Sequence, residues 1–215
     1  EVNIGQSGAG GSLSSVELWC DYVYLDTDER RRFAQVSHEY LIEQLQYQSF
    51  SAASTFSLNF NHPVKELMFA GQRAAGAGTQ GSSATPVPVS LHSDTDTKLC
   101  RTDGSTGGKI TLKLNGHERF AKKHINYFTR TQAYEHHPNC GGGAHADAIG
   151  VYSFALEPEE HQPSGTCNFS RIDTAQLVFD NKVCGGTTSE GLHIYAVNYN
   201  VLRIMSGMGG LAYSN

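Results

Sequence analysis

The chain has 215 residues, a formal net charge of −5 and 23 glycines, with 39% hydrophobic and 17% charged residues. This length can bury one sizeable core, and little charge combined with much glycine favours an all-β domain over a helical one. The acidic balance argues against a nucleic-acid-binding coat, which needs a basic surface. No run reaches the roughly 18 apolar residues that a membrane-spanning helix requires.

The cysteines are odd in number and widely scattered, and no two of them form a CxxC pair. This pattern argues against a disulfide framework and against a zinc ribbon. We therefore expect free thiols, as in a reducing compartment, at Cys20, Cys100, Cys140, Cys167 and Cys184.

The first part of the chain predicts a flexible segment, a strand, a helix and a second strand. Residues 1–15 are rich in Gly and Ser and are expected to be flexible. Residues 16–25 (VELWCDYVYL) predict a strand. Residues 26–35 predict a short helix, because a capping Asp26 or Thr27 precedes two acids and then three arginines, an order that suits the helix dipole. Residues 38–46 fit neither period cleanly, and we interpret them as a strand.

The next segments alternate between apolar and polar residues. Residues 56–60 predict a half-buried strand that ends at Pro63, and residues 64–70 predict another. Residues 109–114 (KITLKL) predict a strand with Ile110, Leu112 and Leu114 inward and Lys109, Thr111 and Lys113 outward, followed by the turn signal Asn115–Gly116. Residues 71–108 lack periodicity and predict a long surface loop.

The last part of the chain continues this β pattern. Residues 117–137 predict an irregular aromatic segment with one helical turn, and residues 151–156 and 171–180 predict strands. Residues 192–215 are apolar on both faces and predict two interior strands, near residues 192–198 and 201–213. Within the second of these, backbone bends are expected at Gly207, Gly209 and Gly210. The result is an all-β, eight-stranded antiparallel jelly-roll sandwich, preceded by one strand and a short linker helix.

A metal site is the first candidate for chemistry. Zinc and copper accept the side chains found in the run HHPNCGGGAHAD, but the spacing matches no familiar ligand pattern and three glycines in succession do not make a rigid cage. A cupin would need two histidines one residue apart, which the chain lacks. A polar, histidine-rich loop is the favoured interpretation of His136, His137, Cys140, His145 and Asp147.

Other candidate sites also have simpler explanations. Glycosidases use paired carboxylates, but Glu157, Glu159 and Glu160 lie in a proline-bounded loop and are interpreted as solvated. Asn168 begins the sequon Asn-Phe-Ser and is a weak glycosylation candidate. We therefore predict no catalytic residue, no cofactor and no metal ligand.

Several longer runs carry a resemblance to a known family. They are LDTDERRRFAQ and HEYLIEQLQ, LNFNHPVKEL, LNGHERF, YSFALEPEEHQPSGTCNFSRID and NYNVLRIMSGMGGLAYSN. In this order they closely resemble the major capsid protein of large icosahedral double-stranded DNA viruses, nearest to the phycodnavirus and iridovirus branches. The resemblance extends over nearly the whole chain from Val16.

The resemblance implies a double jelly roll, of which this chain is similar to the C-terminal portion. Residues 1–25 would then be a flexible segment and the last strand of a first jelly roll that is missing here. Residues 26–37 would be the linker helix, and residues 38–215 the second jelly roll, with a surface loop at 71–108. The implied function is structural: homotrimeric, pseudo-hexagonal capsomers that tile the shell of the virion.

The resemblance also implies partners. Each capsomer would contact neighbouring capsomers, penton proteins and minor capsid proteins, after assembly in the host cytoplasm. An inner viral membrane would lie nearby without insertion of this chain, nucleic acid would not be bound directly, and outer loops would carry glycans. The alternatives are a carbohydrate-binding or attachment jelly roll and a cupin-like metalloenzyme.

Overall fold

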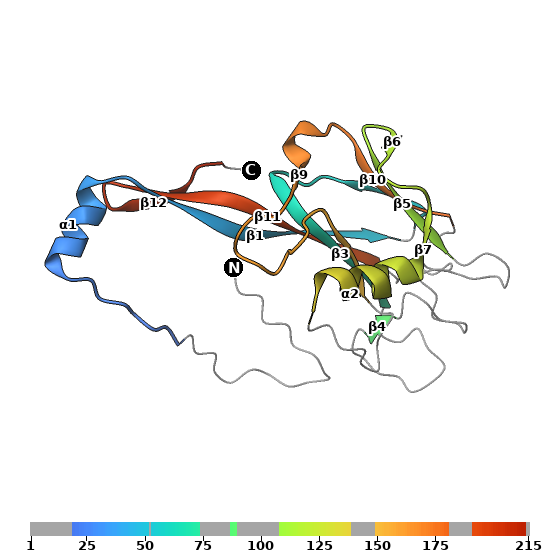
Figure 1. Ribbon diagram of the computed structural model, residues 1–215, viewed down its shortest axis with the longest axis horizontal. Helices are drawn as coiled ribbons and strands as arrows, with labels where there is room; N and C mark the ends of the chain where they lie inside the picture. The colour runs from blue at the N-terminus through green and yellow to red at the C-terminus, as the bar shows by residue number, and fades with distance from the viewer. Residues whose placement is uncertain are drawn as a thin grey trace.

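The structure, a computed structural model, describes residues 19–51, 53–73, 87–89, 108–138, 149–180 and 191–213. Its strands form two antiparallel sheets that face each other (Figure 1). The larger sheet has seven strands: β1 (His38–Ser51), β11 (Gly191–Met205), β3 (Pro63–Arg73), β4 (Val87–Val89), β8 (Ile149–Ser153), β9 (Cys167–Asn168) and β12 (Met208–Leu211). The smaller sheet has five: β2 (Thr55–Leu58), β10 (Ala175–Phe179), β5 (Lys109–Leu114), β6 (His117–Glu118) and β7 (Lys123–His124).

The core lies between the two sheets. Alternate residues of each strand point inward, as the strand period requires, and they include Phe56, Leu177 and Leu112 of the small sheet. They pack against inward residues of the large sheet such as Phe69 and Ile194. The ring of Phe179 is edge-on to those of Phe56 and Phe69, at 5.5 and 6.3 Å. This two-layer packing confirms the predicted sandwich, although the structure divides it into twelve strands where the sequence predicts eight.

The predicted linker helix is present as α1 (Thr27–Gln35). The Asp26 side chain accepts a hydrogen bond from the Thr27 backbone N–H, and Asp28 and Glu29 lie in the first turn. In the aromatic segment, the single predicted turn is instead a π-helical turn η1 (Tyr127–Thr131) that continues into α2 (Gln132–His136). Phe128 is buried in the core, which explains why this segment folds onto the sandwich.

Residues 19–25 pair with none of the described strands, and the first jelly roll in which their strand was predicted is not part of this chain. Two other sequence-based predictions need correction. Thr111 points to a buried site rather than to solvent, since its hydroxyl donates a hydrogen bond to the Phe120 carbonyl at 2.9 Å. The segment at 71–108 begins with strand β3, which extends to Arg73 and pairs with β4; the rest of it lies outside the described residues.

The C-terminal stretch is also divided differently from the prediction. β11 runs without a break from Gly191 to Met205, and the chain turns at Ser206 and Gly207 into β12. Gly207 has a φ of 76°, which favours glycine. Gly209 and Gly210 lie inside β12, whose register with β11 is continuous, so neither is a bend.

Candidate assembly surface

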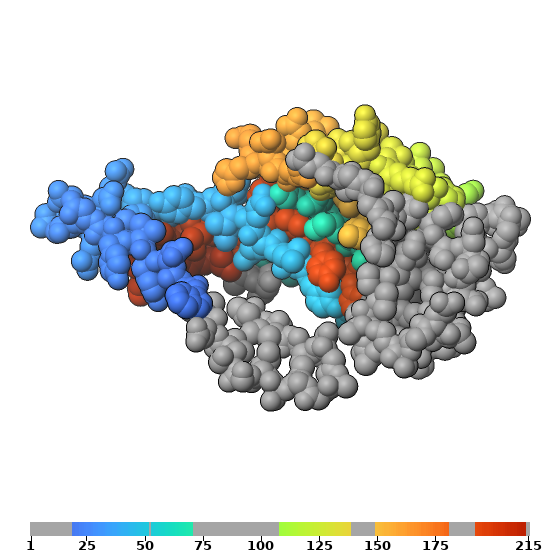
Figure 2. Space-filling view, turned by 90° about the horizontal axis from the view of Figure 1, so that it is seen from below, coloured from blue at the N-terminus to red at the C-terminus, as the bar shows by residue number. Residues whose placement is uncertain are grey.

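One face of the seven-stranded sheet lies outside the core and carries several apolar side chains among polar ones. In β1 the even-numbered residues are turned toward the core, so the odd-numbered residues point away from the small sheet. Leu45 and Tyr47 are 60% and 50% exposed there, and the strand register places Val197 and Tyr195 beside them. We call this set the outer face: Leu41, Leu45, Tyr47, Met68, Ile149, Tyr195, Val197 and Val201. Figure 2 looks onto this side, where atoms of β1, β3 and β11 are visible.

Such a face is typical of a protein–protein contact. Monomeric soluble proteins rarely expose contiguous apolar patches larger than a few hundred Å², and larger patches mark interaction sites. Antiparallel sheets in water normally alternate between an apolar and a polar face, whereas both faces of β11 carry apolar side chains.

Three ring side chains, Tyr47 and Tyr195 of the outer face and the neighbouring His193, pack together on this side of the sheet. The Tyr47 ring stacks on the His193 imidazole, with centroids 5.7 Å apart and an interplanar angle of 8°, and it lies 5.0 Å from the Tyr195 ring. The Tyr47 hydroxyl and His193 Nδ1 are 2.5 Å apart in a hydrogen bond. Burial lowers the pKa of His193, so the neutral ring is favoured. A neutral ring is compatible with an apolar contact.

The ends of β1 and β11 near α1, together with β12, form a three-stranded extension that projects beyond the sandwich (Figure 1). Its side chains include the exposed Met205, Met208 and Leu211. The Gly207 N–H donates to the Phe33 carbonyl at 3.2 Å, which attaches the turn to α1. No second layer of described residues covers this extension. Its apolar side chains therefore extend the surface available for assembly.

The segment before α1 is also aromatic and exposed. Trp19 and Tyr24 are 87% and 91% exposed, and Tyr22 and Val23 are exposed as well. Four large exposed apolar side chains within six positions are typical of a segment that contacts another surface.

A β-bulge places two charged residues beside the outer face. Val197 pairs with Glu66 and Asn198 pairs with Val64, so Lys65 is the extra residue of β3. Lys65 Nζ donates to Glu43 Oε1 of β1 and to the Pro158 carbonyl, both at 2.6 Å, and lies 5.6 Å from the Tyr199 ring centroid. The extra residue therefore allows Lys65 and Glu66 to reach polar partners on the same side of the sheet.

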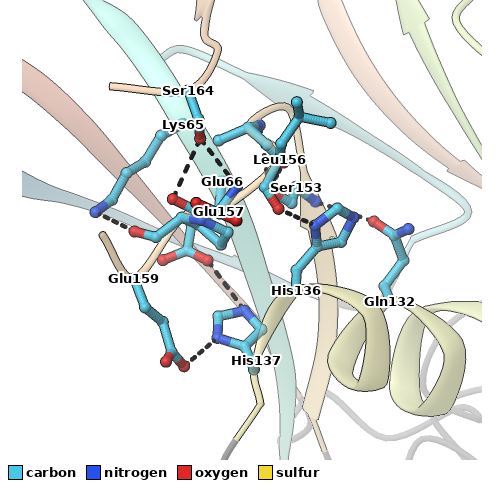
Figure 3. A network of polar contacts seen from close by, with 12 residues as sticks. Lys65, Glu66, Gln132, His136, His137, Ser153, Leu156, Glu157, Glu159 and Ser164 are labelled. Atoms are coloured by element: carbon cyan, nitrogen blue, oxygen red, sulfur yellow. Dashed lines mark hydrogen bonds and ion pairs between the residues drawn. The ribbon is translucent and has the colours of Figure 1, made fainter. Parts of the chain in front are cut away.

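His137, the residue after α2, faces two carboxylates. Its Nε2 lies 3.2 Å from Glu66 Oε2, and its Nδ1 lies 2.9 Å from Glu159 Oε1 (Figure 3). Burial raises the pKa of Glu66, while the charges of His137 and Lys65 oppose that rise. The neighbouring His136 Nδ1 is 2.9 Å from the Leu156 carbonyl and Gln132 Oε1 accepts from the Ser153 N–H, which hold α2 against β8.

Most residues considered from the sequence for chemistry do not form a site. His136 and His137 have the partners just described, whereas Cys140, His145 and Asp147 lie outside the described residues. Among residues that the structure places, no group of three His, Cys, Asp or Glu side chains is arranged to hold a metal ion. Of the three loop acids, Glu159 contacts His137 and is therefore not merely solvated.

Asn168 is exposed, and its side chain caps a short helical turn. Its Oδ1 accepts a hydrogen bond from the Ser170 N–H at 3.1 Å and caps the 3₁₀ turn η2 (Phe169–Arg171). Ser170 Oγ in turn accepts from the His62 N–H at 2.8 Å. Both polar side chains of the sequon therefore hold the turn.

The charged pair Lys65 and Glu66 at the bulge was not predicted from the sequence. Its signal is visible in the run VKELMF, where Lys65 and Glu66 interrupt an otherwise apolar strand. Two adjacent charges in a buried strand indicate that both side chains reach polar partners.

The fold and the exposed apolar face define a β-sandwich subunit built for assembly with other protein surfaces. A sequence model of the family described as "Large eukaryotic DNA virus major capsid protein" matches residues 29–210. The chain is 49% identical to the major capsid protein of Pyramimonas orientalis virus, with 99% of the chain and 52% of that relative covered. It is 39% identical to the major capsid protein of Paramecium bursaria Chlorella virus 1, with 96% and 56% covered.

Solved structures agree with this assignment. The chain matches a quasi-atomic model of the PBCV-1 virus capsid with a TM-score of 0.67 and 37% identity, over 90% of this chain and 56% of that one. The chain therefore belongs to the family of major capsid proteins of large eukaryotic DNA viruses. It spans about half the length of the curated relatives it matches. The family favours a structural role over the carbohydrate-binding alternative. No helix among the described residues is long and apolar enough to cross a membrane.

Proposed function

We propose that this chain is the C-terminal jelly-roll part of a structural shell subunit, and that its outer face is covered by protein in the assembled shell. The observation that carries this proposal is the row of exposed apolar side chains on β1, with Leu45 and Tyr47 at its centre. Membership of the capsid protein family supplies the kind of assembly in which such a face is covered.

The proposed division of the protein rests on the length of its relatives and on the exposure of the segment before α1. The relatives are about twice as long as the matched region. Residues 19–25 supply the last strand of a first jelly roll and gain strand partners only in its presence. α1 then connects the two rolls, and residues 38–215 form the second. The exposure of Trp19 and Tyr24 supports this division, because a strand inserted into a sheet would bury them.

The proposed assembly is a homotrimer whose copies pack into pseudo-hexagonal capsomers. Contacts with neighbouring capsomers, with penton and minor capsid proteins, glycans on outer loops and assembly in the host cytoplasm belong to this proposal. The net charge of −5 supports a shell that does not bind nucleic acid directly.

The test is the mass of the purified protein in solution, measured by light scattering during size-exclusion chromatography. The wild type is expected at three times the mass of one copy. Leu45→Asp places a charge in the outer face, so its mass is expected to fall to one copy. Tyr134→Asp, at an 86% exposed aromatic residue of α2, is the matched control and is expected to keep the wild-type mass. A Leu45→Asp variant that assembles like the wild type would contradict the proposal.

A further inference from the structure

The two faces of β1 carry equal numbers of apolar side chains. The inward, even-numbered face has Tyr40, Ile42 and Phe50, and the outward, odd-numbered face has Leu41, Leu45 and Tyr47. The hydrophobic pattern, which normally decides which face of a strand is buried, therefore does not decide it for β1. No tight turn fixes the register either, because β1 and its partner β11 are far apart in the sequence, with 152 positions between Gln46 and Asn198.

The two faces of β1 differ in a row of side-chain amides. Gln44, Gln46 and Gln48 follow one another on the inward face, and Asn198 and Asn200 lie on the same side of β11. We call these five residues the amide row. Asn198 and Asn200 are 0% and 3% exposed. A buried amide is costly unless its N–H and C=O groups find partners, so the row is stable only where partners face it.

Gln46 makes the most specific contacts of the amide row. Its Oε1 accepts a hydrogen bond from the Asn61 backbone N–H at 3.0 Å, and its Nε2 donates to the Asn61 carbonyl at 2.6 Å and to Asn198 Oδ1 at 3.0 Å. The carboxamide therefore pairs with both backbone groups of Asn61, as a residue of a neighbouring strand does. Gln48 Oε1 likewise accepts from the Asn59 N–H at 3.0 Å. These contacts attach β1 to the segment between β2 and β3.

The asparagines of the amide row also have partners for both ends of their carboxamides. Asn200 Nδ2 donates to Gln44 Oε1 and to the Tyr213 carbonyl, both at 2.9 Å, and Asn200 Oδ1 accepts from the Val201 N–H at 2.7 Å. Asn198 accepts from Gln46, and its Nδ2 donates to the carbonyl of the following residue at 3.2 Å. The buried amides are thus satisfied in the register that the structure shows.

We propose that the amide row determines the register between β1 and β11 and thereby positions the side chains of the outer face. A shift of β1 by one residue exchanges its two faces, because successive side chains of a strand point to opposite sides. The glutamines then point away from Asn198 and Asn200, which stay buried without these partners. The same shift turns Leu45 and Tyr47 inward and removes both from the outer face.

A shift by two residues keeps the faces of β1 but disturbs the core. The ring of Phe50 lies edge-on to that of Phe56, with centroids 5.3 Å apart, and packs against the core cluster. A two-residue shift moves this ring away from its place. The core therefore excludes the two-residue shift, and the amide row excludes the one-residue shift.

The test uses pairs of cysteines, because a disulfide forms only between residues whose Cβ atoms face each other. Glu39 and Arg203 are partners in the register that the structure shows, so Glu39→Cys/Arg203→Cys is expected to form a cross-link. Glu39→Cys combined with Leu202→Cys or with Ile204→Cys reports a shift by one residue in either direction. Mild oxidation followed by mass spectrometry of peptides measures each cross-link and distinguishes it from any that involve the native cysteines.

The double substitution Gln46→Thr/Gln48→Thr keeps polar residues that favour strands but removes the carboxamides that reach residues 59 and 61. The cross-links that report a shift are expected to rise several-fold in this variant, while the native cross-link falls. Ser49→Thr/Ser51→Thr introduces the same residue type at outward positions of β1 and is the matched control, expected to keep the wild-type pattern.

Shifted cross-links that stay at the wild-type level in the double variant would overturn the proposal. A loss of stability in urea without a shifted cross-link has the same meaning, because it shows that the amides stabilise the strand without selecting its register. If the double variant does not fold, Gln48→Thr alone takes its place.

The effect of the amide row on assembly rests on the proposed function, and light scattering separates the two. The double variant is expected to lose part of the wild-type mass, because only some of its molecules present the outer face. Shifted cross-links together with an unchanged mass overturn the link to assembly. A wild type with the mass of one copy overturns the proposed function, and the cross-links then decide the role of the amide row alone.

Discussion

Lys65 Nζ lies 2.6 Å from Glu43 Oε1, so a side chain of β3 reaches across β11 to pair with a side chain of β1. The side chain of Lys65 is 5% exposed, whereas that of Glu43 is 39% exposed. The ammonium group also donates to the Pro158 carbonyl, which brings a loop into the same contact. The bulge thus joins three parts of the fold through one buried charge.

Replacing Lys65 with Ala is therefore expected to reduce the free energy of unfolding by about 2–4 kcal/mol, because its charge-assisted hydrogen bonds and packed stem are lost together. A double-mutant cycle with Glu43→Gln, measured by urea denaturation, is expected to give a coupling above about 1 kcal/mol. The matched control is the exposed pair Arg203–Glu39, which joins the neighbouring strands β11 and β1 with a contact of 2.6 Å and where the coupling is expected to be below about 1 kcal/mol. Equal couplings for the two pairs would contradict the role assigned to the bulge.

Gly207 and Gly209 are expected to respond differently to substitution. Gly207 has a positive φ, so Gly207→Val is expected to cost about 1–2 kcal/mol of stability. A Cβ at Gly209 would meet Leu202 at 3.9 Å, an ordinary contact, and Gly209→Val is expected to change stability by no more than about 0.5 kcal/mol. Melting temperatures of the two variants make the comparison, which fails if Gly209→Val is the more damaging.

Gly150, the glycine of β8, is expected to tolerate substitution poorly. A Cβ there would fall 2.3 Å from an atom of the buried Phe69 ring, which is packed against the rings of Phe128 and Phe179. Gly150→Ala is therefore expected to cost about 1–3 kcal/mol through overpacking. Denaturant unfolding measures this loss, and Gly210→Ala, with open space around its Cβ, is the control. Equal stabilities would show that the ring at Phe69 can shift.

Asn168 is expected to matter for folding through its cap. Asn168→Ala removes the acceptor for the Ser170 N–H and is expected to cost about 1 kcal/mol, whereas Asn168→Asp keeps an acceptor and is expected to be nearly neutral. Thermal unfolding distinguishes the two variants. The cap has no energetic role if both melt at the wild-type temperature.

His193 is expected to make the protein less stable as pH falls. Burial lowers the pKa of His193 below its ordinary value of 6.5. The unfolded chain therefore binds the proton more readily, and the stability present above pH 6.5 is lost as pH falls toward the folded-state value. NMR titration of the ring is expected to show a lowered pKa, and His193→Gln is expected to remove this part of the pH dependence. A pKa at or above 6.5 would contradict the burial of the ring.

The sequence predicts those parts of the fold that depend on local pattern. Alternation identifies the strand at Lys109–Leu114, and a capping Asp26 followed by acids identifies α1. The long apolar C-terminal stretch is also evident, but its sequence suggests that both faces are interior. In the structure only one face of β11 packs in the core, and Tyr195 and Val197 lie on the outer face. That difference was not predictable, because apolar residues on both faces of a strand do not indicate which face packs in the core.

The charged part of the site was less predictable than the strands. The bulge at Lys65 depends on the register between β3 and β11, which are more than a hundred residues apart in the sequence. The same holds for His137 and its two acids, which are brought together by the packing of α2 and a loop against the sheet. Local sequence gives no information about such a meeting of distant segments.

The central claim is that protein covers the outer face in the assembled shell. Electron cryo-microscopy of the assembled protein tests it most directly, because side chains around Leu45, Tyr47 and Tyr195 can be located in the map. Density from another jelly roll, of the same or a neighbouring copy, is expected to pack against these three side chains and to exclude solvent. A map in which they remain open to solvent throughout the shell would contradict it.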